Sequence, residues 1–195
     1  MIKRITDILF SAIGILVLSP LFIFISIKIS FDSKGGILYR QRRVGKNIKD
    51  FQLLKFRTMV VNADQQGLLT VGAKDSRITK FGSFLRQYKL DELPQLYNVF
   101  IGDMSLVGPR PEVRKYVELY TQQQLQIFSI RPGITDFASI KFSNENELLG
   151  MANDPEATYI NEIMPAKLEL NLKYIREQSL MTDLRILFAT MKKIF

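Results

Sequence analysis

The longest apolar pattern in the chain is an uncharged run of twenty residues, ILFSAIGILVLSPLFIFISI, from Ile8 to Ile27. As a helix rising ~1.5 Å per residue it would reach ~30 Å, about one hydrocarbon thickness of a bilayer. No polar face interrupts the run, which argues against a helix in the core of a soluble domain. Ser19 and Pro20 lie near its middle, where a proline bends a helix. The pattern therefore predicts a membrane helix broken at Ser19-Pro20.

Two membrane topologies fit this run: a single spanning helix, and a re-entrant helix that enters and leaves by one face. Basic residues flank it on both sides, with Lys3 and Arg4 before it and Lys28 and Lys34 after it. Because Lys and Arg prefer the cytoplasmic side, basic flanks at both ends favour re-entry. Under either topology, residues 34–195 are expected in the cytoplasm. We therefore expect two units, a membrane helix over 1–33 and a catalytic or binding domain over 34–195.

Downstream of residue 34 the apolar spacing changes from one segment to the next. Residues 37–59 alternate like a β-hairpin with a Gly-Lys-Asn turn at 45–47, and residues 77–89 have helical spacing. A further helix is expected to begin at Asp91 with Pro94 in its first turn. The remaining expectations are a mobile segment at 60–76, a loop at 102–112, a helix at 112–128, a rigid turn at 131–135, a helix at 155–176 interrupted at Pro165, and an amphipathic interfacial helix at 180–195. The fold class predicted is α+β, mostly helical with one small antiparallel hairpin.

The composition restricts which catalytic groups and metal ligands the protein can use. The chain has no Cys and no His, which excludes disulfides, Cys/His zinc sites and His-dependent catalytic triads. A metal would need oxygen ligands, which favours Mg²⁺ or Mn²⁺. Of the net charge of +8, most falls in residues 34–57, where Asp50 alone opposes the basic side chains. Such a patch favours an anionic partner: phospholipid headgroups, nucleic acid or nucleotide phosphates.

An acidic pair, Asp91-Glu92, stands out in this basic chain. One interpretation is structural: Asp91 is a helix N-cap and Glu92 an acid of the first turn. The other is chemical: an N-cap aspartate faces free N–H groups, which keep it ionised as a nucleophile or Mg²⁺ ligand must be. The local pattern alone favours the cap. The chain has no Cys or His that could act instead, and cations lie nearby in the sequence. Both observations favour the chemical interpretation.

Five cations are candidate phosphate ligands. Arginine next to proline loses little entropy on binding and suits bidentate phosphate contact. Taken singly, each of these residues also fits a solvated surface charge, and no Walker or G-x-G-x-x-G motif is present. The candidates are Lys55, Arg57, Arg86, Arg110 and Arg131.

Three motifs, KFRTM, LDELPQLYNVFIGDMSLVGPRPE and RPGIT, follow the apolar segment with its Ser-Pro in that order. Together they closely resemble the bacterial sugar transferase family, the monotopic phosphoglycosyl transferases that start glycan assembly on polyprenol phosphate. The resemblance runs from the membrane segment to about residue 140. It is the compact form of the family that the chain resembles, without the extra membrane helices of larger relatives.

The resemblance implies transfer of a sugar-1-phosphate from a UDP-sugar to undecaprenyl phosphate, with Mg²⁺ and release of UMP. It implies that Asp91 is the nucleophile, carrying a covalent phosphosugar, and a Mg²⁺ ligand, with Glu92 as a positioning or proton-handling partner. It also implies a re-entrant helix broken at Ser19-Pro20. The location expected is the cytoplasmic face of the bacterial inner membrane. The reaction expected is the first membrane step of O-antigen, capsule, exopolysaccharide or glycoprotein assembly.

The chain departs from commoner relatives after GIT, where they read Gly-Trp-Ala-Gln and this chain reads Asp-Phe-Ala-Ser at 136–139. Sugar choice could be made there or in residues 143–195, so the sugar and the glycan pathway stay undetermined. The partners expected are a UDP-sugar, polyprenol phosphate and inner-membrane phospholipid, with a homodimer left open. Two other hypotheses remain: a non-enzymatic binder of anionic lipid, and a tethered nucleic-acid binder. The second is disfavoured because few aromatics interleave the basic cluster, and we expect no nucleic acid.

Overall fold

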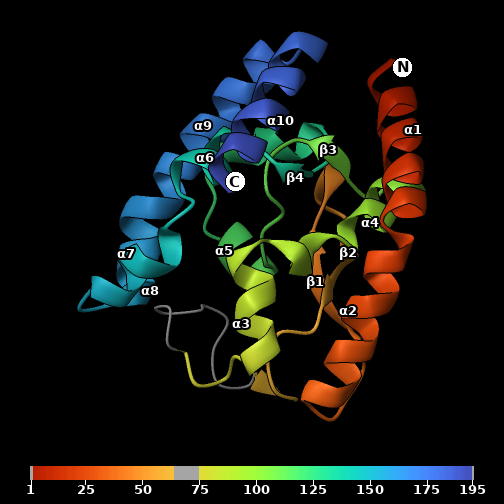
Figure 1. Cartoon of the computed structure of the whole chain (residues 1–195). Helices are drawn as coiled ribbons and strands as arrows, with labels where there is room; N and C mark the ends of the chain where they lie inside the picture. The colour runs from red at the N-terminus through yellow and green to blue at the C-terminus, as the bar shows by residue number, and fades with distance from the viewer. Residues whose placement is uncertain (1, 64–74, 195) are drawn as a thin grey trace.

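The computed structural model describes residues 2–63 and 75–194. It confirms the predicted class, because helices predominate and an antiparallel hairpin is present (Figure 1). The α-helices are α1 (Ile2–Val17), α2 (Ser19–Asp32), α3 (Lys80–Gln87), α4 (Gln95–Ile101), α5 (Arg114–Val117), α6 (Phe137–Lys141), α7 (Glu145–Met151), α8 (Pro155–Thr158), α9 (Met164–Glu177) and α10 (Leu180–Ile194). The strands are β1 (Leu38–Val44), β2 (Asp50–Phe56), β3 (Ser105–Val107) and β4 (Gly133–Thr135).

The N-terminal apolar run forms two helices with a break at the predicted place. α1 ends at Val17, and α2 begins at Ser19 with Pro20 in its first turn. The missing N–H of proline is harmless there, because first-turn N–H groups have no partner within the helix. Within residues 2–63 and 75–194, no one helix has both the length and the apolar character needed to cross a bilayer; α1 and α2 reach them only as a pair, which bends by 60°. Figure 1 shows the pair along one edge of the molecule (red to orange).

The hairpin forms as predicted, with β1 and β2 paired antiparallel from Leu38 opposite Phe56 to Val44 opposite Asp50. Its turn is a short 3-10 segment, Lys46–Ile48, in which Asn47 is left-handed with φ 57°. The predicted turn at 45–47 is therefore confirmed. Leu53 and Phe56 of β2 are buried on opposite faces of the hairpin, in different apolar clusters, and Lys55 projects from the same face as Leu53.

The second sheet was not predicted. β3 and β4 pair in parallel, with Ser105 opposite Gly133 and Val107 opposite Thr135, in segments whose Gly and Pro content predicted only loops and turns. Gly108 and Gly133 let the two backbones approach each other closely. A Cβ on Gly133 would lie 2.0 Å from the backbone nitrogen of Gly108. Pairing between residues 28 positions apart in the sequence is a tertiary contact, which local composition does not encode.

Other boundaries shift as well. Residues 112–128, predicted as one helix, contain only α5 and a 3-10 segment, Gln124–Ser129. The interruption expected at Pro165 is a π-helical turn, Tyr159–Ile163, which joins α8 to α9, and Pro165 lies in the first turn of α9. The segment predicted to be mobile, 60–76, falls mostly on residues 64–74, outside the described residues.

The largest apolar cluster lies under the C-terminal helices and includes Tyr116, Ile127, Leu149, Leu168 and Leu172. A second cluster joins Ile25 and Ile29 of α2 to Phe56 and Leu85 of the domain. α1 packs against α4 and β3. The bent helix pair is therefore part of the packed fold, and its position fixes the elements that carry the site.

Candidate active site

Asp91 and Glu92 lie in a one-turn 3-10 segment, Leu90–Glu92, between α3 and α4. Lys89, just before it, is left-handed with φ 56°, and this separates the segment from α3. The prediction that a helix begins at Asp91 was wrong, because α4 begins at Gln95 with Pro94 at its N-cap position. Asp91 is therefore not the cap of a long helix, and its ionisation must be judged from its actual neighbours.

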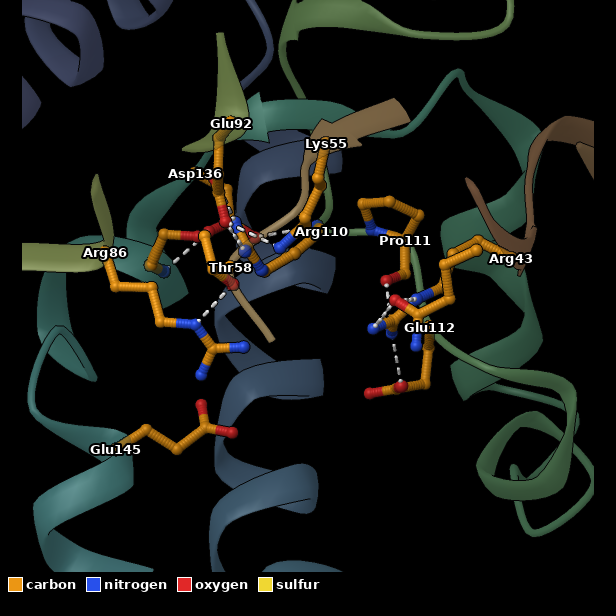
Figure 2. Close-up of polar contacts among 12 residues, drawn as sticks. Arg43, Lys55, Thr58, Arg86, Glu92, Arg110, Pro111, Glu112, Asp136 and Glu145 are labelled. Carbon is orange, nitrogen blue, oxygen red and sulfur yellow. Dashed lines mark hydrogen bonds and ion pairs between the residues drawn. The ribbon is translucent and has the colours of Figure 1, made fainter. Parts of the chain in front are cut away.

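Glu92 is held by two cations. Lys55 of β2 donates to its carboxylate at 3.0 Å, and Arg110 donates through both terminal nitrogens, one of them at 3.2 Å from Oε2 (Figure 2). Burial opposes ionisation of Glu92, but the attraction of Arg110 and Lys55 outweighs it and holds the pKa of this carboxyl well below its usual range. Glu92 therefore stays a carboxylate at neutral pH, which suits positioning of the two cations.

Asp91 has the opposite environment. It is 6% exposed, and burial raises the pKa of its carboxyl, as does the adjacent charge of Glu92. Lys55, Arg86 and Lys89 act in the other direction without cancelling this shift. Two adjacent carboxyls whose pKa values are driven apart are typical of sites where they have different roles.

Arg86 approaches the acidic pair from α3, and Arg110 approaches it from the segment after β3. Arg86, on the last turn of α3, donates from Nε to the hydroxyl of Thr58 at 2.8 Å. Arg110 follows β3, and its backbone N–H donates to the buried carboxylate of Asp136 at 3.1 Å. Figure 2 shows these side chains converging on Glu92 and Thr58. The cations are thus fixed by short polar contacts and are not free surface charges.

The other two predicted phosphate ligands lie differently. Arg57 is 8% exposed, and its Nη2 donates to the carbonyls of Ser33 at 2.6 Å and Ile29 at 3.3 Å, at the C-terminal end of α2. Arg131 donates from Nε to the carbonyl of Gly102 at 2.7 Å. The structure thus brings Lys55, Arg86 and Arg110 together with the acidic pair. Substrate binding by Arg57 and Arg131 stays a prediction.

Two cavities meet at Asp91. The larger has a volume of about 660 Å³ and reaches from the acidic pair to α6, α7 and α9. The smaller has a volume of about 400 Å³ and reaches toward Gly36, Arg57 and Val60. Both are lined by the same four charged residues, Arg43, Lys55, Arg86 and Asp91. A carboxylate at such a junction can be approached from two sides.

The charged residues that sequence reasoning missed hold this arrangement together. Arg43 pairs with Glu112 at 2.9 Å, and Asp136 accepts from the backbone of Arg110. Glu145 lines the larger cavity. Asp136 does carry a local signal, because it follows a strand and caps α6. No local pattern pointed to Arg43 or Glu145 as members of the site.

Few protein oxygens are available for a metal ion. Within residues 2–63 and 75–194, no group of three acidic side chains is close enough to hold one. Glu92 is engaged by two cations, so Asp91 is the carboxylate left at the junction of the cavities. This donor set fits Mg²⁺, which typically binds through one or two carboxylates and completes its shell with water and substrate phosphates.

Comparison with known proteins identifies the relatives of the chain. The family model described as bacterial sugar transferase matches residues 1–195. The chain is 37% identical, over 99% of its length, to a UDP-N-acetylgalactosamine-undecaprenyl-phosphate N-acetylgalactosaminephosphotransferase of Aeromonas hydrophila. It is 35% identical, over its whole length, to a UDP-glucose:undecaprenyl-phosphate glucose-1-phosphate transferase of Escherichia coli K12. These matches cover 43% and 40% of the two relatives, so the chain spans about two fifths of their length.

A relative of similar size also matches. The chain is 36% identical to the exopolysaccharide production protein PSS of Rhizobium leguminosarum bv. phaseoli, covering 97% of this chain and 92% of that protein. The similarity thus extends through residues 141–195, beyond the motifs that first indicated it.

Proposed function

The chain belongs to the bacterial sugar transferase family, and from that premise we propose that it transfers a sugar-1-phosphate from a UDP-sugar to undecaprenyl phosphate. The names of its relatives support both substrates. The observation that carries the chemistry is the position of Asp91, a buried carboxylate among cations at the junction of two cavities. The reaction would be an early membrane step of bacterial polysaccharide or glycoprotein assembly.

In the first proposed step, a carboxylate oxygen of Asp91 attacks the sugar-bearing phosphorus of the donor. A bond forms between this oxygen and phosphorus, and the bond from phosphorus to the bridging oxygen breaks, so that UMP leaves with that oxygen. In the second step a phosphate oxygen of undecaprenyl phosphate attacks the same phosphorus. The Asp91–phosphorus bond breaks, which restores the carboxylate and gives undecaprenyl diphosphate sugar.

The cations have a direct role in these steps. Phosphoryl transfer depends mainly on positioning and on neutralising phosphate charge. Lys55 and Arg110 are fixed by Glu92, and Arg86 by Thr58, so all three can contact phosphate oxygens without losing much conformational freedom. Glu92 acts as a positioning residue for Lys55 and Arg110, since its depressed pKa disfavours a proton-handling role.

Mg²⁺ is the proposed cofactor, held by Asp91 together with the donor phosphates. When bound, it would neutralise diphosphate charge and favour the ionised form of Asp91. Without such a charge, burial disfavours that form, as the raised pKa of Asp91 indicates.

A membrane location is proposed for the bent helices, with re-entry from the cytoplasmic face of the inner membrane. α1 and α2 expose large apolar side chains, including Leu16, Val17 and Phe31 at 75, 68 and 86%. On α10, which reaches α1 through the Lys3–Asp183 ion pair, Phe188 is 69% exposed. Exposed apolar surface of this extent is typical of membrane or protein interfaces. A dip into one leaflet would bring the site to the depth of lipid headgroups.

The test is UMP release by the purified protein with Mg²⁺, undecaprenyl phosphate and each of a panel of UDP-sugars. Release is expected with at least one sugar, and chelation of the metal should stop it. Recovery of radiolabelled sugar phosphate bound to the protein when the acceptor is omitted would identify the covalent step. If a protein that binds undecaprenyl phosphate released no UMP with any donor, the non-enzymatic lipid-binding hypothesis would replace this one.

A further inference from the structure

The larger cavity continues well past the phosphate-holding cations. Its far end is lined by Ser139 of α6, Glu145 of α7, and Lys167 and Asn171 of α9. Lys167 and Asn171 are four residues apart on one helix and therefore project from the same face. None of these four residues has a part in the steps proposed above.

Two polar groups at this end are buried without partners. Asn171 is 4% exposed, and its side-chain oxygen has no hydrogen-bond partner among the described residues. The hydroxyl oxygen of Ser139 is also buried and has no hydrogen-bond partner among the described residues. Most buried polar groups in native proteins are paired, and leaving one unpaired costs about 1–3 kcal/mol. Because both residues line the cavity, a ligand there would supply the missing partners.

Glu145 is already oriented for binding. Its Oε2 accepts from Lys167 at 2.7 Å, and the two side chains are 24% and 13% exposed. The Lys167 ammonium also lies 5.4 Å from the ring centre of Tyr159, which fixes it further. In Figure 2 the carboxylate of Glu145 and the guanidinium of Arg86 point toward one another. Glu145 is thus neutralised by one lysine while its other oxygen can still accept a hydrogen bond.

One buried residue links this end of the cavity to the phosphate end. Asp136 accepts from the backbone N–H of Arg110 at 3.1 Å through one oxygen, and from that of Ser139 at 2.6 Å through the other. It is fully buried. The spacing between the proposed phosphate ligand Arg110 and the unpartnered Ser139 is therefore set by a single carboxylate.

We propose that Ser139, Glu145 and Asn171 bind the sugar ring of the donor and determine which sugar is accepted. This inference rests on the proposed function and deepens it. Asn171 and Glu145 offer acceptors for sugar hydroxyl or amide N–H groups, and the Ser139 hydroxyl can donate or accept. Because Glu145 and Lys167 neutralise each other, this end of the cavity offers hydrogen-bonding groups without net charge, which suits a neutral hexose or acetamido sugar.

The test uses Asn171→Leu and Ser139→Ala, which remove the two unpartnered groups with little change in shape. Both variants should fold, with Tm unchanged or raised, because neither group makes a hydrogen bond within the described protein. For the preferred UDP-sugar, kcat/KM should fall about tenfold in Asn171→Leu. The ratio of kcat/KM for the preferred UDP-sugar to kcat/KM for a poorer UDP-sugar should also fall. Asn161→Leu, the same exchange at an exposed residue, is the matched control and should change neither quantity.

Inhibition by UMP separates this proposal from its main alternative, recognition of uracil at the same place. UMP lacks the transferred sugar of the donor, so its inhibition constant should be equal in wild type and Asn171→Leu. A weaker UMP inhibition in the variant would assign this end of the cavity to the nucleoside and overturn the proposal. An unchanged ratio between sugars in both variants would also overturn it, while UMP release by the wild type would leave the proposed function intact. Failure of the wild type to release UMP would refute the function itself.

Discussion

Asp91 and Glu92 are consecutive residues whose carboxyl pKa values shift in opposite directions, upward for Asp91 and downward for Glu92. Burial favours a raised pKa at both carboxyls, and only at Glu92 do the neighbouring cations outweigh it. Glu92 meets Lys55 and Arg110 directly, whereas Asp91 is buried with no hydrogen bond of that kind from either cation. The first two predictions follow from this contrast.

Replacing Asp91 by Asn should abolish UMP release and raise thermal stability at neutral pH. The raised pKa of Asp91 means that the folded protein favours the protonated carboxyl, so any stability it contributes is lost as pH rises through the folded pKa. Asn avoids this loss. The gain in Tm should therefore be clear near pH ~7 and vanish below the unfolded pKa of ~3.9. Differential scanning calorimetry across pH measures it.

The matched control for this variant is Glu118→Gln, which neutralises an exposed acid outside both cavities. It should leave UMP release and Tm nearly unchanged. Wild-type rates in Asp91→Asn would show that Asp91 is not the nucleophile.

Glu92→Gln should destabilise the protein by about 3 kcal/mol at neutral pH, because it leaves Lys55 and Arg110 partly buried without a counter-charge. The depressed pKa gives the opposite pH dependence from that of Asp91. The stabilisation by Glu92 is present above its unfolded pKa of ~4.3 and is lost as pH falls toward the folded value. Unfolding measured at several pH values should show wild type and variant converging in acid.

An exposed ion pair provides the comparison for Glu92→Gln. In Glu156→Gln, the Lys115–Glu156 pair is broken where both side chains are about half exposed, and the cost should be below ~1 kcal/mol. Equal losses in the two variants would contradict a special role for the Glu92 cluster.

Gly35→Ala should destabilise the junction between α2 and the domain by about 1–3 kcal/mol. Gly35 has φ +125°, and a Cβ there would lie 2.2 Å from Nη1 of Arg57. Arg57 would have to leave its contacts with the last carbonyls of α2. Thermal unfolding measures the loss. Gly36→Ala is the neighbouring control, because its Cβ would meet nothing closer than 3.7 Å, and a similar loss there would refute the explanation.

Pro20→Ala tests the re-entrant topology. Without proline, a continuous helix over α1 and α2 becomes accessible, and its N-terminal end should cross to the periplasmic side in part of the population. Since the chain lacks cysteine, single cysteines at Ile2 and Lys34 can be labelled by a membrane-impermeant thiol reagent. With Pro20 present, both should react only from the cytoplasmic side. Periplasmic labelling of Ile2→Cys in a chain that retains Pro20 would establish a spanning helix instead.

Much of the local structure was predictable because its causes are local. The break at Ser19-Pro20 follows from the geometry of proline, and the hairpin follows from alternation around a turn. The β3–β4 pair was not predictable in this way, since its partners are distant in the chain and its glycines serve a close approach of two backbones. The prediction that a helix begins at Asp91 was wrong because the left-handed Lys89 is followed by a separate 3-10 turn, and α4 begins only at Gln95.

The sequence by itself determined the absence of cysteine and histidine chemistry, the apolar N-terminal helix with its break, and the candidate acids and cations. These are properties of residue type and short-range spacing. Only the tertiary structure decided that Lys55 and Arg110 engage Glu92, that Arg57 contacts the end of α2, and that Ser139, Glu145 and Asn171 share one cavity. The physical reason is that a side chain's charge state and role depend on which distant groups share its low-dielectric surroundings, and folding alone sets those neighbours.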